Sequence, residues 1–219
     1  MAGGLLGFSG NIAGVSAPSK SEFLPASLRE MCAAVHFETG DTVFRMGSRT
    51  HSVFFVEAGS VRLLRYGRAG EDILLHKAHA GEFIAEASLD SPRYHCDAVA
   101  GEPSDVLQCP ANALKQMLET DGTFARKWSS LLARELRQAR ARFERISLKS
   151  AAERVRHLLV SEGRGPQCEF QIDGTVKELA HTLGLSHEAL YRTLAAMARE
   201  GVIDRDQMAI RFADKGSGV

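Results

Sequence analysis

The sequence predicts an α+β chain with an N-terminal antiparallel β-barrel, a long helix and a C-terminal winged helix-turn-helix. The first observation is a run of short alternating segments, separated by glycines, from about residue 35 to 110. The second is a helical stretch that begins at Thr123 and contains no Gly or Pro before Gly163. The third is a pair of short capped helices followed by a hairpin pattern near the C-terminus.

Composition places the chain among ordinary globular proteins. Hydrophobic residues make up 44% and charged residues 25% of its 219 residues. No apolar run approaches the ~18 residues that a membrane helix needs, and the first 20 residues lack the layout of a signal peptide. We therefore expect a cytoplasmic protein without a membrane partner. In that compartment its four cysteines are expected to be free thiols rather than a disulfide framework.

Charge is balanced overall but uneven along the chain. The 27 basic and 27 acidic side chains argue against a strongly basic coat for nucleic acid. Residues 119–165, however, hold 11 Lys or Arg against 6 Asp or Glu. A solvated helix face is the simpler explanation of this basic stretch, and a stripe that faces phosphates is the alternative.

The barrel is assigned to residues 21–118, after a Gly-, Ala- and Ser-rich segment, 1–20, that is predicted to be a mobile tail. Its expected strands include residues 42–45, 53–56, 61–64 and 72–76. Short strands at regular spacing are typical of an antiparallel barrel or sandwich. No helix of ordinary length fits between Phe37 and Val106, and residues 111–118 form a short helix candidate.

Residues 119–148 are predicted to form one long helix that joins two copies of the chain. Apolar side chains recur along it at alternating spacings of four and three, which is the seam of a coiled coil: Leu132, Leu136, Ala139, Phe143 and Ile146. Arginines flank this narrow seam. A helix packed within its own domain is the alternative, but the flanking charge favours a partner helix, so we expect a homodimer.

Residues 149–219 are predicted to form a winged helix-turn-helix. Thr175 and Glu178 have the spacing of a capping box at the start of one helix. Ser186 caps a second helix, which Gly201 ends. A glycine turn at 183–185 joins the two helices, and the apolar segments 202–203 and 208–210 form a hairpin around a polar turn. Two short helices and a hairpin in this order are typical of DNA-binding domains.

The start of that second helix carries the residues expected to contact DNA: Ser186, His187, Glu188, Tyr191 and Arg192. Four of them, from His187 onward, cluster on one face, and the opposite face is apolar. Such a helix end fits the major groove, where Arg pairs with guanine O6 and N7 and Glu accepts from cytosine N4. An exposed helix with incidental charges is the alternative.

Several motifs between about residues 23 and 212 are specific enough to indicate a family. In the barrel they are Phe37-x-x-Gly40-Asp41, Phe44-Arg45-x-Gly47, Val53-x-x-Val56-x-x-Gly59-Ser60-Val61, and Gly81-Glu82-Phe83-Ile84 with Glu86. In the recognition helix the motif is Ser186-His187-Glu188-Ala189-x-x-Arg192. With these motifs the chain resembles the Crp–Fnr family of bacterial transcription regulators, whose cyclic-AMP branch reads Ser-Arg-Glu-Thr-x-x-Arg in that helix.

The resemblance implies a jelly-roll barrel of the cyclic-nucleotide-binding type and a homodimer joined through the long helix. It also implies a palindromic operator in double-stranded DNA, with RNA polymerase as a further partner, and no catalytic residues. At position 187 a His replaces the family's Arg, which changes the contact expected at the outer base.

The effector is predicted to differ from cyclic AMP. Tyr94 and His95 stand where the family's cyclic-AMP binders place an Arg-Ser pair on the nucleotide phosphate, and Arg93 is one residue out of register. Ala85 and Ser88 replace glycines whose backbone amides approach the phosphate.

The adenine contacts also change. Ala139 and Arg140 take the places of the Thr-Ser pair that meets the base on the long helix. The candidate effector pocket consists of Glu86, Arg93, Tyr94, His95, Cys96 and Arg140. Its small effector is unknown.

Haem, a metal ion and redox-active thiols are the candidates that could replace the nucleotide. Cys32 is the only cysteine before the Gly81-Glu82-Phe83-Ile84 motif. The four-cysteine iron–sulfur cluster of the oxygen-sensing branch therefore cannot form in the N-terminal part of the chain. The carbon-monoxide-sensing haem branch has a Cys and a His in the segment that here reads Ile84-Ala85-Glu86, so its haem ligands are not present at these positions. Another mode of haem binding remains open.

A hairpin centred between Pro103 and Ser104 would bring Cys96 and Cys109 close together along one ladder. In a regular strand His95 and Cys96 point to opposite faces, so a sensor using His95 with either cysteine needs an irregular strand. The simpler interpretation is that Cys96 belongs to the core.

Two other classes of function remain as alternatives: a ligand-binding barrel that regulates a protein partner, and a cupin-like metalloprotein. His76 and His79 invite a metal hypothesis, but this spacing on a strand puts the two rings on opposite faces. Surface histidines are the simpler interpretation. Cupins need a His-x-His pair with a Glu, and the sequence contains no such pair. A non-enzymatic, effector-responsive regulator is therefore the leading prediction.

Overall fold

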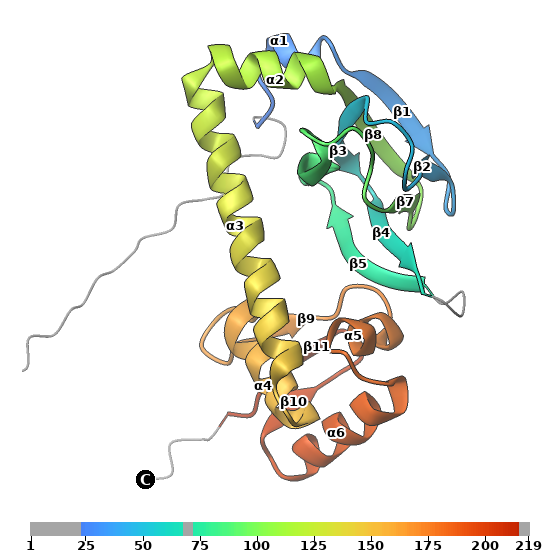
Figure 1. Ribbon diagram of the computed structural model, residues 1–219. Helices are drawn as coiled ribbons and strands as arrows, with labels where there is room; N and C mark the ends of the chain where they lie inside the picture. The colour runs from blue at the N-terminus through green and yellow to red at the C-terminus, as the bar shows by residue number, and fades with distance from the viewer. Residues whose placement is uncertain (1–22, 68–71, 215–219) are drawn as a thin grey trace, which may run out of the picture. The chain divides into compact units, whose positions relative to one another are not determined.

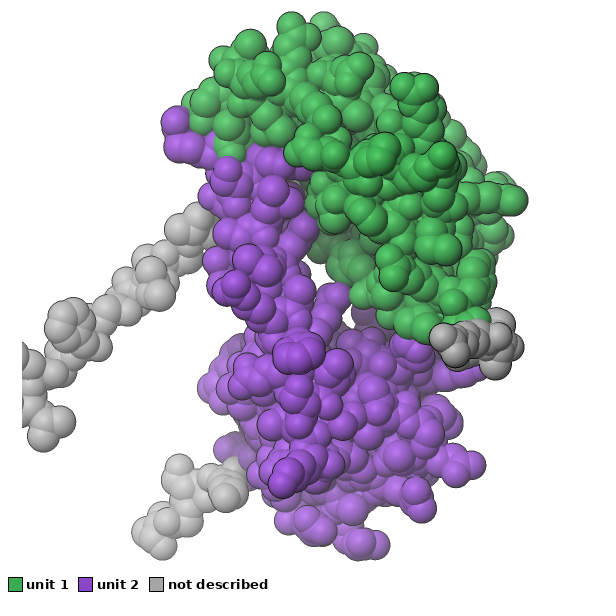
Figure 2. All heavy atoms as spheres, viewed as in Figure 1, with its two compact units in different colours: residues 1–125 green, residues 126–219 purple. Residues whose placement is uncertain are grey.

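The computed structural model describes residues 23–67 and 72–214 and divides the chain into two compact units, residues 1–125 and 126–219 (Figure 2). The predicted tail, residues 1–20, lies outside the described residues. The division falls inside helix α3 (Gly122–Ser147), so the first turn of that helix belongs to the first unit.

The strands described in the first unit form two four-stranded antiparallel sheets (Figure 1). One sheet has the order β1 (Ala33–Phe37), β8 (Ser104–Pro110), β3 (Ser52–Ala58), β6 (Phe83–Ile84). The other has the order β2 (Thr42–Phe44), β7 (Asp97–Ala100), β4 (Ser60–Tyr66), β5 (Asp72–His79). The jelly-roll prediction is confirmed, although the described strands form two sheets instead of one closed ladder.

Apolar side chains from both sheets make the core of the first unit. Phe44 of β2, Phe54 of β3, Val61 of β4 and Val106 of β8 all expose less than a tenth of their surface. Strands place every second side chain on the same face, which is why a period of two in the sequence becomes one buried layer. Burial of this apolar surface is the main stabilising contribution to the unit.

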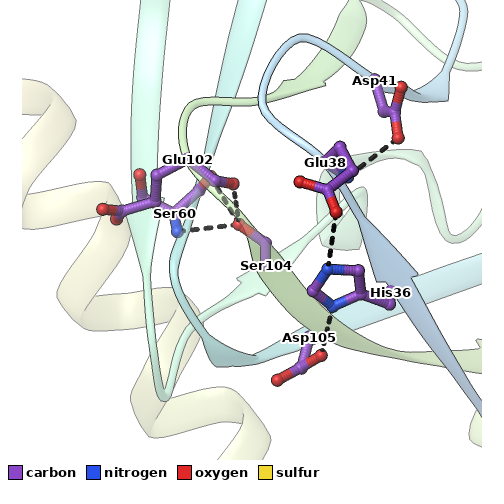
Figure 3. Close-up of polar contacts among 7 residues, drawn as sticks. All are labelled: His36, Glu38, Asp41, Ser60, Glu102, Ser104 and Asp105. Atoms are coloured by element: carbon purple, nitrogen blue, oxygen red, sulfur yellow. Dashed lines mark hydrogen bonds and ion pairs between the residues drawn. The ribbon is translucent and has the colours of Figure 1, made fainter.

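The turn between β3 and β4 depends on Gly59. Its φ is +78°, and an added Cβ would lie 2.4 Å from the Pro103 carbonyl oxygen, so no other residue fits without moving the backbone. Beside it, Ser104 Oγ accepts a hydrogen bond from the Ser60 N–H at 3.1 Å and donates to the Glu102 carbonyl at 2.7 Å (Figure 3). These contacts hold the β3–β4 turn against the start of β8.

Further along β8, an exposed ion pair joins this strand to β1. His36 Nδ1 lies 2.7 Å from Asp105 Oδ1 (Figure 3), and the two residues are directly opposite in the β1–β8 register. The hydrogen bond to Asp105 raises the pKa of His36 above its ordinary value.

Helices α1 (Ala26–Arg29) and α2 (Ala111–Thr120) lie at the ends of the first unit's strands. Leu28 of α1 and Leu114 of α2 are fully buried. The helix expected at 111–118 is therefore confirmed, two residues longer than predicted.

The helical stretch after Thr123 is two helices. Helix α3 ends at Ser147, and helix α4 (Ala151–Glu162) begins after a capping box in which Ser150 Oγ accepts from Glu153 N–H and the Glu153 carboxylate accepts from Ser150 N–H. Ser150 competes for the backbone hydrogen bonds of a continuing helix, which is why the chain breaks here without Gly or Pro.

The second unit closes with helices α5 (Val176–Thr182) and α6 (His187–Arg199) and a three-stranded sheet of β9 (Phe170–Gln171), β10 (Ile203–Arg205) and β11 (Ala209–Phe212) in the order β10-β11-β9. The predicted helices and hairpin are confirmed, and β9 is an additional strand. The buried core takes side chains from each of the helices α4 to α6, among them Leu158, Leu179 and Leu190.

Two predictions about the cysteines are wrong. Strand β7 pairs with β2 and β4, whereas β8 pairs with β1 and β3, so the two strands lie in different sheets and the hairpin expected around Pro103 does not form. Cys109 instead forms a disulfide with Cys32, although free thiols were expected. Cys96 and Cys168 are free. No helix in the described part of the chain is long and apolar enough to cross a membrane.

Candidate DNA-binding and effector sites

The start of helix α6 presents the predicted DNA-contacting residues to solvent. Ser186 is the N-cap, and its Oγ accepts a hydrogen bond from Ala189 N–H at 3.1 Å. His187, Glu188 and Arg192 are exposed, and Tyr191 is 56% exposed. The opposite face is buried through Leu190, Leu194 and Met197. A helix buried on one face and polar on the other at its capped end can enter a major groove.

The turn before α6 is fixed by a residue that the sequence analysis did not single out. Arg154 of α4 donates from Nη1 to the carbonyls of Leu183 and Gly184, at 3.0 and 2.9 Å, and from Nε to the Leu148 carbonyl at 3.0 Å. Gly184 takes a φ of +62° in this turn. Arg154 therefore ties the turn between α5 and α6 to the segment that joins α3 and α4.

The wing is the hairpin of β10 and β11, and its turn is held by Asp206. The Oδ1 atom accepts hydrogen bonds from the backbone N–H groups of Met208 and Ala209 at 2.7 and 2.8 Å, which lowers the pKa of Asp206. Arg205, next to this turn, lies over the ring of Tyr191 on α6. The wing and the recognition helix thus form one surface.

The predicted seam of α3 is exposed in the single chain. Leu132, Leu136, Phe143 and Ile146 expose 39%, 51%, 71% and 46% of their surface, and Ala139 is exposed as well. Large apolar side chains in a row on one helix seldom stay in water, because burying each would stabilise the protein. The pattern is typical of a helix that meets a partner.

One arginine of α3 behaves differently from its neighbours. Arg145 is completely buried, forms an ion pair with Glu162 of α4, and donates from Nη2 to Ser161 Oγ at 3.1 Å. Its Nε and Nη1 atoms are buried and have no hydrogen-bond partner among the described residues. No sequence signal distinguished this arginine from the exposed ones beside it.

Glu86 is the most unusual of the predicted effector residues. It opens a short 3-10 helix, η2 (Glu86–Ser88), directly after Ala85, whose φ is +68°. Its Oε2 atom is buried and has no hydrogen-bond partner in the described chain, and burial raises the pKa of Glu86. Hydrogen bonds from the backbone N–H groups of Glu86 and Ala87 act in the opposite direction, but burial outweighs them and favours the protonated carboxyl group.

Two titratable side chains, those of His76 and Glu82, lie near Glu86. His76 Nε2 is 3.7 Å from Glu82 Oε2, and the charge of His76 also acts on Glu86. Burial tends to raise the pKa of Glu82, but the hydrogen bonds from His76 and from the His79 N–H outweigh it, so the net effect lowers this pKa. His76 and His79, expected on the surface, are half-buried.

His95 and Cys96 lie near the short helix that begins at Glu86. His95 Nδ1 is 2.9 Å from Ser88 Oγ, and its carbonyl accepts from Arg65 Nε at 3.0 Å. Cys96 is half-buried against the core of the first unit, and burial raises the pKa of its thiol. This packing agrees with the simpler interpretation of Cys96 as a core residue.

The other predicted effector residues have different surroundings. Tyr94 is buried in the core, with its ring stacked on Phe44 at 4.1 Å and its hydroxyl donating to the Ser52 carbonyl at 2.8 Å. Arg93 is exposed and donates to the Gly47 carbonyl. Arg140 is exposed on α3, in the second unit.

The metal and haem hypotheses lose one of their pairings. Cys109 is bonded to Cys32 and belongs to the sheet that does not contain β7, so a shared site of His95 with Cys109 is wrong. Among the described residues, no three His, Cys, Asp or Glu side chains are grouped in a way that could hold a metal ion.

Comparison with known proteins agrees with both units. Residues 34–121 match the cyclic nucleotide-binding domain family, and residues 153–216 match the Crp-like helix-turn-helix domain family. The chain is 32% identical to a cyclic AMP receptor protein of Thermus thermophilus over 171 residues, which is 76% of this chain and 77% of the relative. It is 24% identical to the transcriptional activator protein FnrA of Stutzerimonas stutzeri, over 80% of this chain and 74% of that one.

Solved structures show the same fold. A CooA mutant from Carboxydothermus hydrogenoformans superposes with a TM-score of 0.72 at 15% identity, over 86% of this chain and 87% of that chain. The catabolite activator protein of Thermus thermophilus matches with a TM-score of 0.50 at 28% identity, over 90% and 91% of the two chains. With its two domain types, their order and these relatives, the chain belongs to the Crp–Fnr family of DNA-binding transcription regulators.

Proposed function

We propose that two copies of the chain join through α3 and bind a palindromic operator, under the control of a small effector other than cyclic AMP that the first unit holds. RNA polymerase is the proposed partner at the promoter, and the cytoplasm is the proposed location. The observation that carries the proposal is the solvent-exposed polar face at the capped start of α6, formed by His187, Glu188, Tyr191 and Arg192.

The chemistry of this face suits base reading. Arg192 can donate two hydrogen bonds to guanine, and Glu188 can accept one from cytosine, as in other helices that enter the major groove. Ser186 uses its hydroxyl for the helix cap, so it is proposed to meet a phosphate through its position at the helix N-terminus.

The proposal of a dimer is supported by the exposed seam of α3. Leu136 and Phe143 are the most exposed of its large apolar side chains. In a partner helix they would fill holes between four residues, as coiled-coil seams do. Two recognition helices, one from each copy, then read two half-sites about one helical turn apart.

The proposal that the effector is not cyclic AMP is supported by the two residues at the predicted phosphate position; the Arg65 guanidinium described beside them donates from Nε to the His95 carbonyl. Tyr94 there is committed to the core, and His95 is hydrogen-bonded to Ser88. The Glu86 carboxyl, whose Oε2 atom is buried without a partner among the described residues, repels an anion when ionised.

The experiment that tests the proposed function is operator selection. Purified protein is used to enrich binding sequences from a random duplex pool, and the selected operator is then titrated with variants. We expect Arg192→Ala to cost about 1–3 kcal/mol and to relax one guanine preference. Arg199→Ala is the matched control, because Arg199 is exposed on the same helix but in its last turn. Failure to enrich any palindrome, or equal losses for both variants, would refute the assignment.

A further inference from the structure

The disulfide closes one end of the β1–β8 pairing. Ala33 lies opposite Gln108 in the antiparallel register, so Cys32 and Cys109 occupy the next position along the same ladder. Their Cα atoms are 4.3 Å apart, the spacing of directly opposite residues in an antiparallel pair. The backbone pairing, which does not depend on the sulfur atoms, therefore brings these two cysteines together.

The two sulfur atoms differ in access. Cys109 is fully buried, whereas Cys32 is half-buried at the edge where β1 begins. Cys32 is therefore the more exposed of the two residues, and Cys109 is its buried partner. This is the arrangement of an accessible cysteine beside a resolving cysteine.

The bond also joins the N-terminal segment to the strand that leads into α2. Cys32 ends the segment of residues 23–32, whose Phe23 packs edge-on against Phe83 at 5.5 Å and Phe124 at 6.0 Å between ring centroids. Phe124 is in the first turn of α3 and is buried. Cys109, on the other side of the bond, is followed within two residues by α2, which leads into α3. In Figure 1, α1 lies against α2 at this point.

We propose that Cys32 and Cys109 form a redox-reversible bond through which thiol oxidants and reductants control operator binding. The proposal rests on the proposed function, because a DNA-binding regulator works in a compartment where thiols are kept reduced. Disulfides in that compartment are usually transient and sense the redox state. In the oxidised protein the N-terminal segment is clamped to β8, and Phe23 is held against the first turn of α3.

The chemistry balances with a hydroperoxide as oxidant and a dithiol as reductant. The Cys32 thiolate attacks the hydroperoxide, the O–O bond breaks, and Cys32 becomes a sulfenic acid while an alcohol or water leaves. The Cys109 thiol then attacks the Cys32 sulfur; the S–S bond forms, and the hydroxyl leaves as water with the Cys109 proton. For reduction, the dithiol supplies two electrons and two protons, restores both thiols and becomes a disulfide itself.

Reduction should loosen the clamp without unfolding the unit. The bond spans 77 residues of sequence, and closing so long a loop restricts the unfolded chain strongly. We therefore expect the melting temperature of the reduced protein to be roughly 5–15 °C lower. Because the first turn of α3 loses the fixed contact with Phe23, we expect the reduced dimer to bind the selected operator about tenfold more weakly.

The test uses the full chain, a hydroperoxide and dithiothreitol. Differential alkylation with mass spectrometry follows the thiols, and operator titration follows the function. In the Cys96→Ser/Cys168→Ser double variant, which keeps only the proposed pair, operator affinity should still change with redox state. In Cys32→Ser it should stay constant and close to that of the reduced parent.

The switch is overturned if the oxidised and reduced parent bind the operator with equal affinity. It is also overturned if Cys32→Ser still responds to redox state, or if dithiothreitol cannot open the Cys32–Cys109 bond in the folded protein. Cys109→Ala is a second variant without the bond and should behave like Cys32→Ser, so the test does not depend on one substitution. If neither redox form binds any operator, the proposed function fails. If both forms bind equally, only the switch fails.

Discussion

Arg205 of the wing lies over the ring of Tyr191 in the recognition helix, with its guanidinium carbon 5.2 Å from the ring centroid. The two residues come from different elements, β10 and α6, and Tyr191 is 56% exposed. The contact holds the exposed ring against the wing, where it borders the residues proposed to read DNA. An exposed cation–π pair contributes ~0.5–1 kcal/mol.

The first prediction is that Tyr191 and Arg205 act as a pair in operator binding. We expect each alanine variant to weaken binding, and the double variant to weaken it by about 0.5–1 kcal/mol less than the two losses added together. Tyr191→Phe keeps the ring and is the control. Strict additivity in a titration of all four proteins would mean that the contact has no role on DNA.

Local signals in the sequence predicted the second unit well. The Thr175/Glu178 box and the Ser186 cap each act within four residues, so the boundaries of α5 and α6 follow from neighbouring residues alone. The box at Ser150 and Glu153 has the same form, and the long helix ends close to the predicted residue 148. Its predicted start at residue 119 is wrong, because residues 119 and 120 belong to α2, which ends before Asp121.

Long-range pairing was less accessible to sequence reasoning. The strands were found, but which strand lies beside which depends on contacts between distant segments, and the assumed β7–β8 hairpin placed Cys109 beside the wrong cysteine. The sequence around these two arginines does not predict that Arg145 is buried or that Arg154 donates hydrogen bonds to three carbonyls. Their roles follow from tertiary packing.

The second prediction concerns the seam of α3. Replacing Leu136 and Phe143 together with Glu should dissociate the dimer, because a partner helix would have to bury unpaired charge. Operator binding should be lost with the dimer, since each half-site is read by one copy. Sedimentation velocity measures the assembly, and Gln138→Glu, at an exposed position off the seam, is the control. A charged double variant that sediments as a dimer would contradict the seam.

The third prediction concerns the pH dependence contributed by Glu86. Burial raises its pKa in the folded protein above the ordinary value of 4.5. Its contribution to stability is therefore fully present below pH 4.5 and declines as the pH rises through the folded pKa, because the carboxyl group must then be buried ionised. Glu86→Gln removes this decline.

Urea unfolding at pH 4 and pH 7 measures the effect. We expect the free energy of unfolding of Glu86→Gln, relative to that of the parent, to be higher at pH 7 than at pH 4. Glu102→Gln is the control, because Glu102 is exposed and should show no such difference. A Glu86→Gln variant with the same relative stability at both pH values would show that the Glu86 carboxyl is not buried as described.

The fourth prediction is that cyclic AMP and cyclic GMP do not act as effectors. A phosphodiester needs a fixed cation and close backbone donors, and the described residues at this position are Tyr94 in the core and His95 bonded to Ser88. Calorimetry should detect no complex with a Kd of about 1 µM or tighter, which would correspond to about −8 kcal/mol. Micromolar binding of either nucleotide would refute this prediction.

The last prediction concerns the buried ion pair of Arg145 and Glu162, which joins the end of α3 to α4. Arg145 has two buried nitrogen atoms without a partner in the described chain, so the cost of burying its charge is only partly offset. Arg145→Met keeps most of the volume and removes the charge and the unpaired donors, while Glu162 is 36% exposed and can be hydrated. We expect this variant to unfold at the same urea concentration as the parent or at a higher one.

Removing the other partner should have the opposite effect. Glu162→Gln leaves the buried guanidinium without a counter-charge; breaking a fully buried pair costs about 3–5 kcal/mol, and the loss here should be smaller because Glu162 is 36% exposed. The comparison therefore has a defined order of stability: Arg145→Met at or above the parent, and Glu162→Gln below it. Arg145→Met could instead lose as much stability as Glu162→Gln. That result would contradict the prediction and would mean that the ion pair, rather than the volume of the side chain, stabilises the junction of α3 and α4.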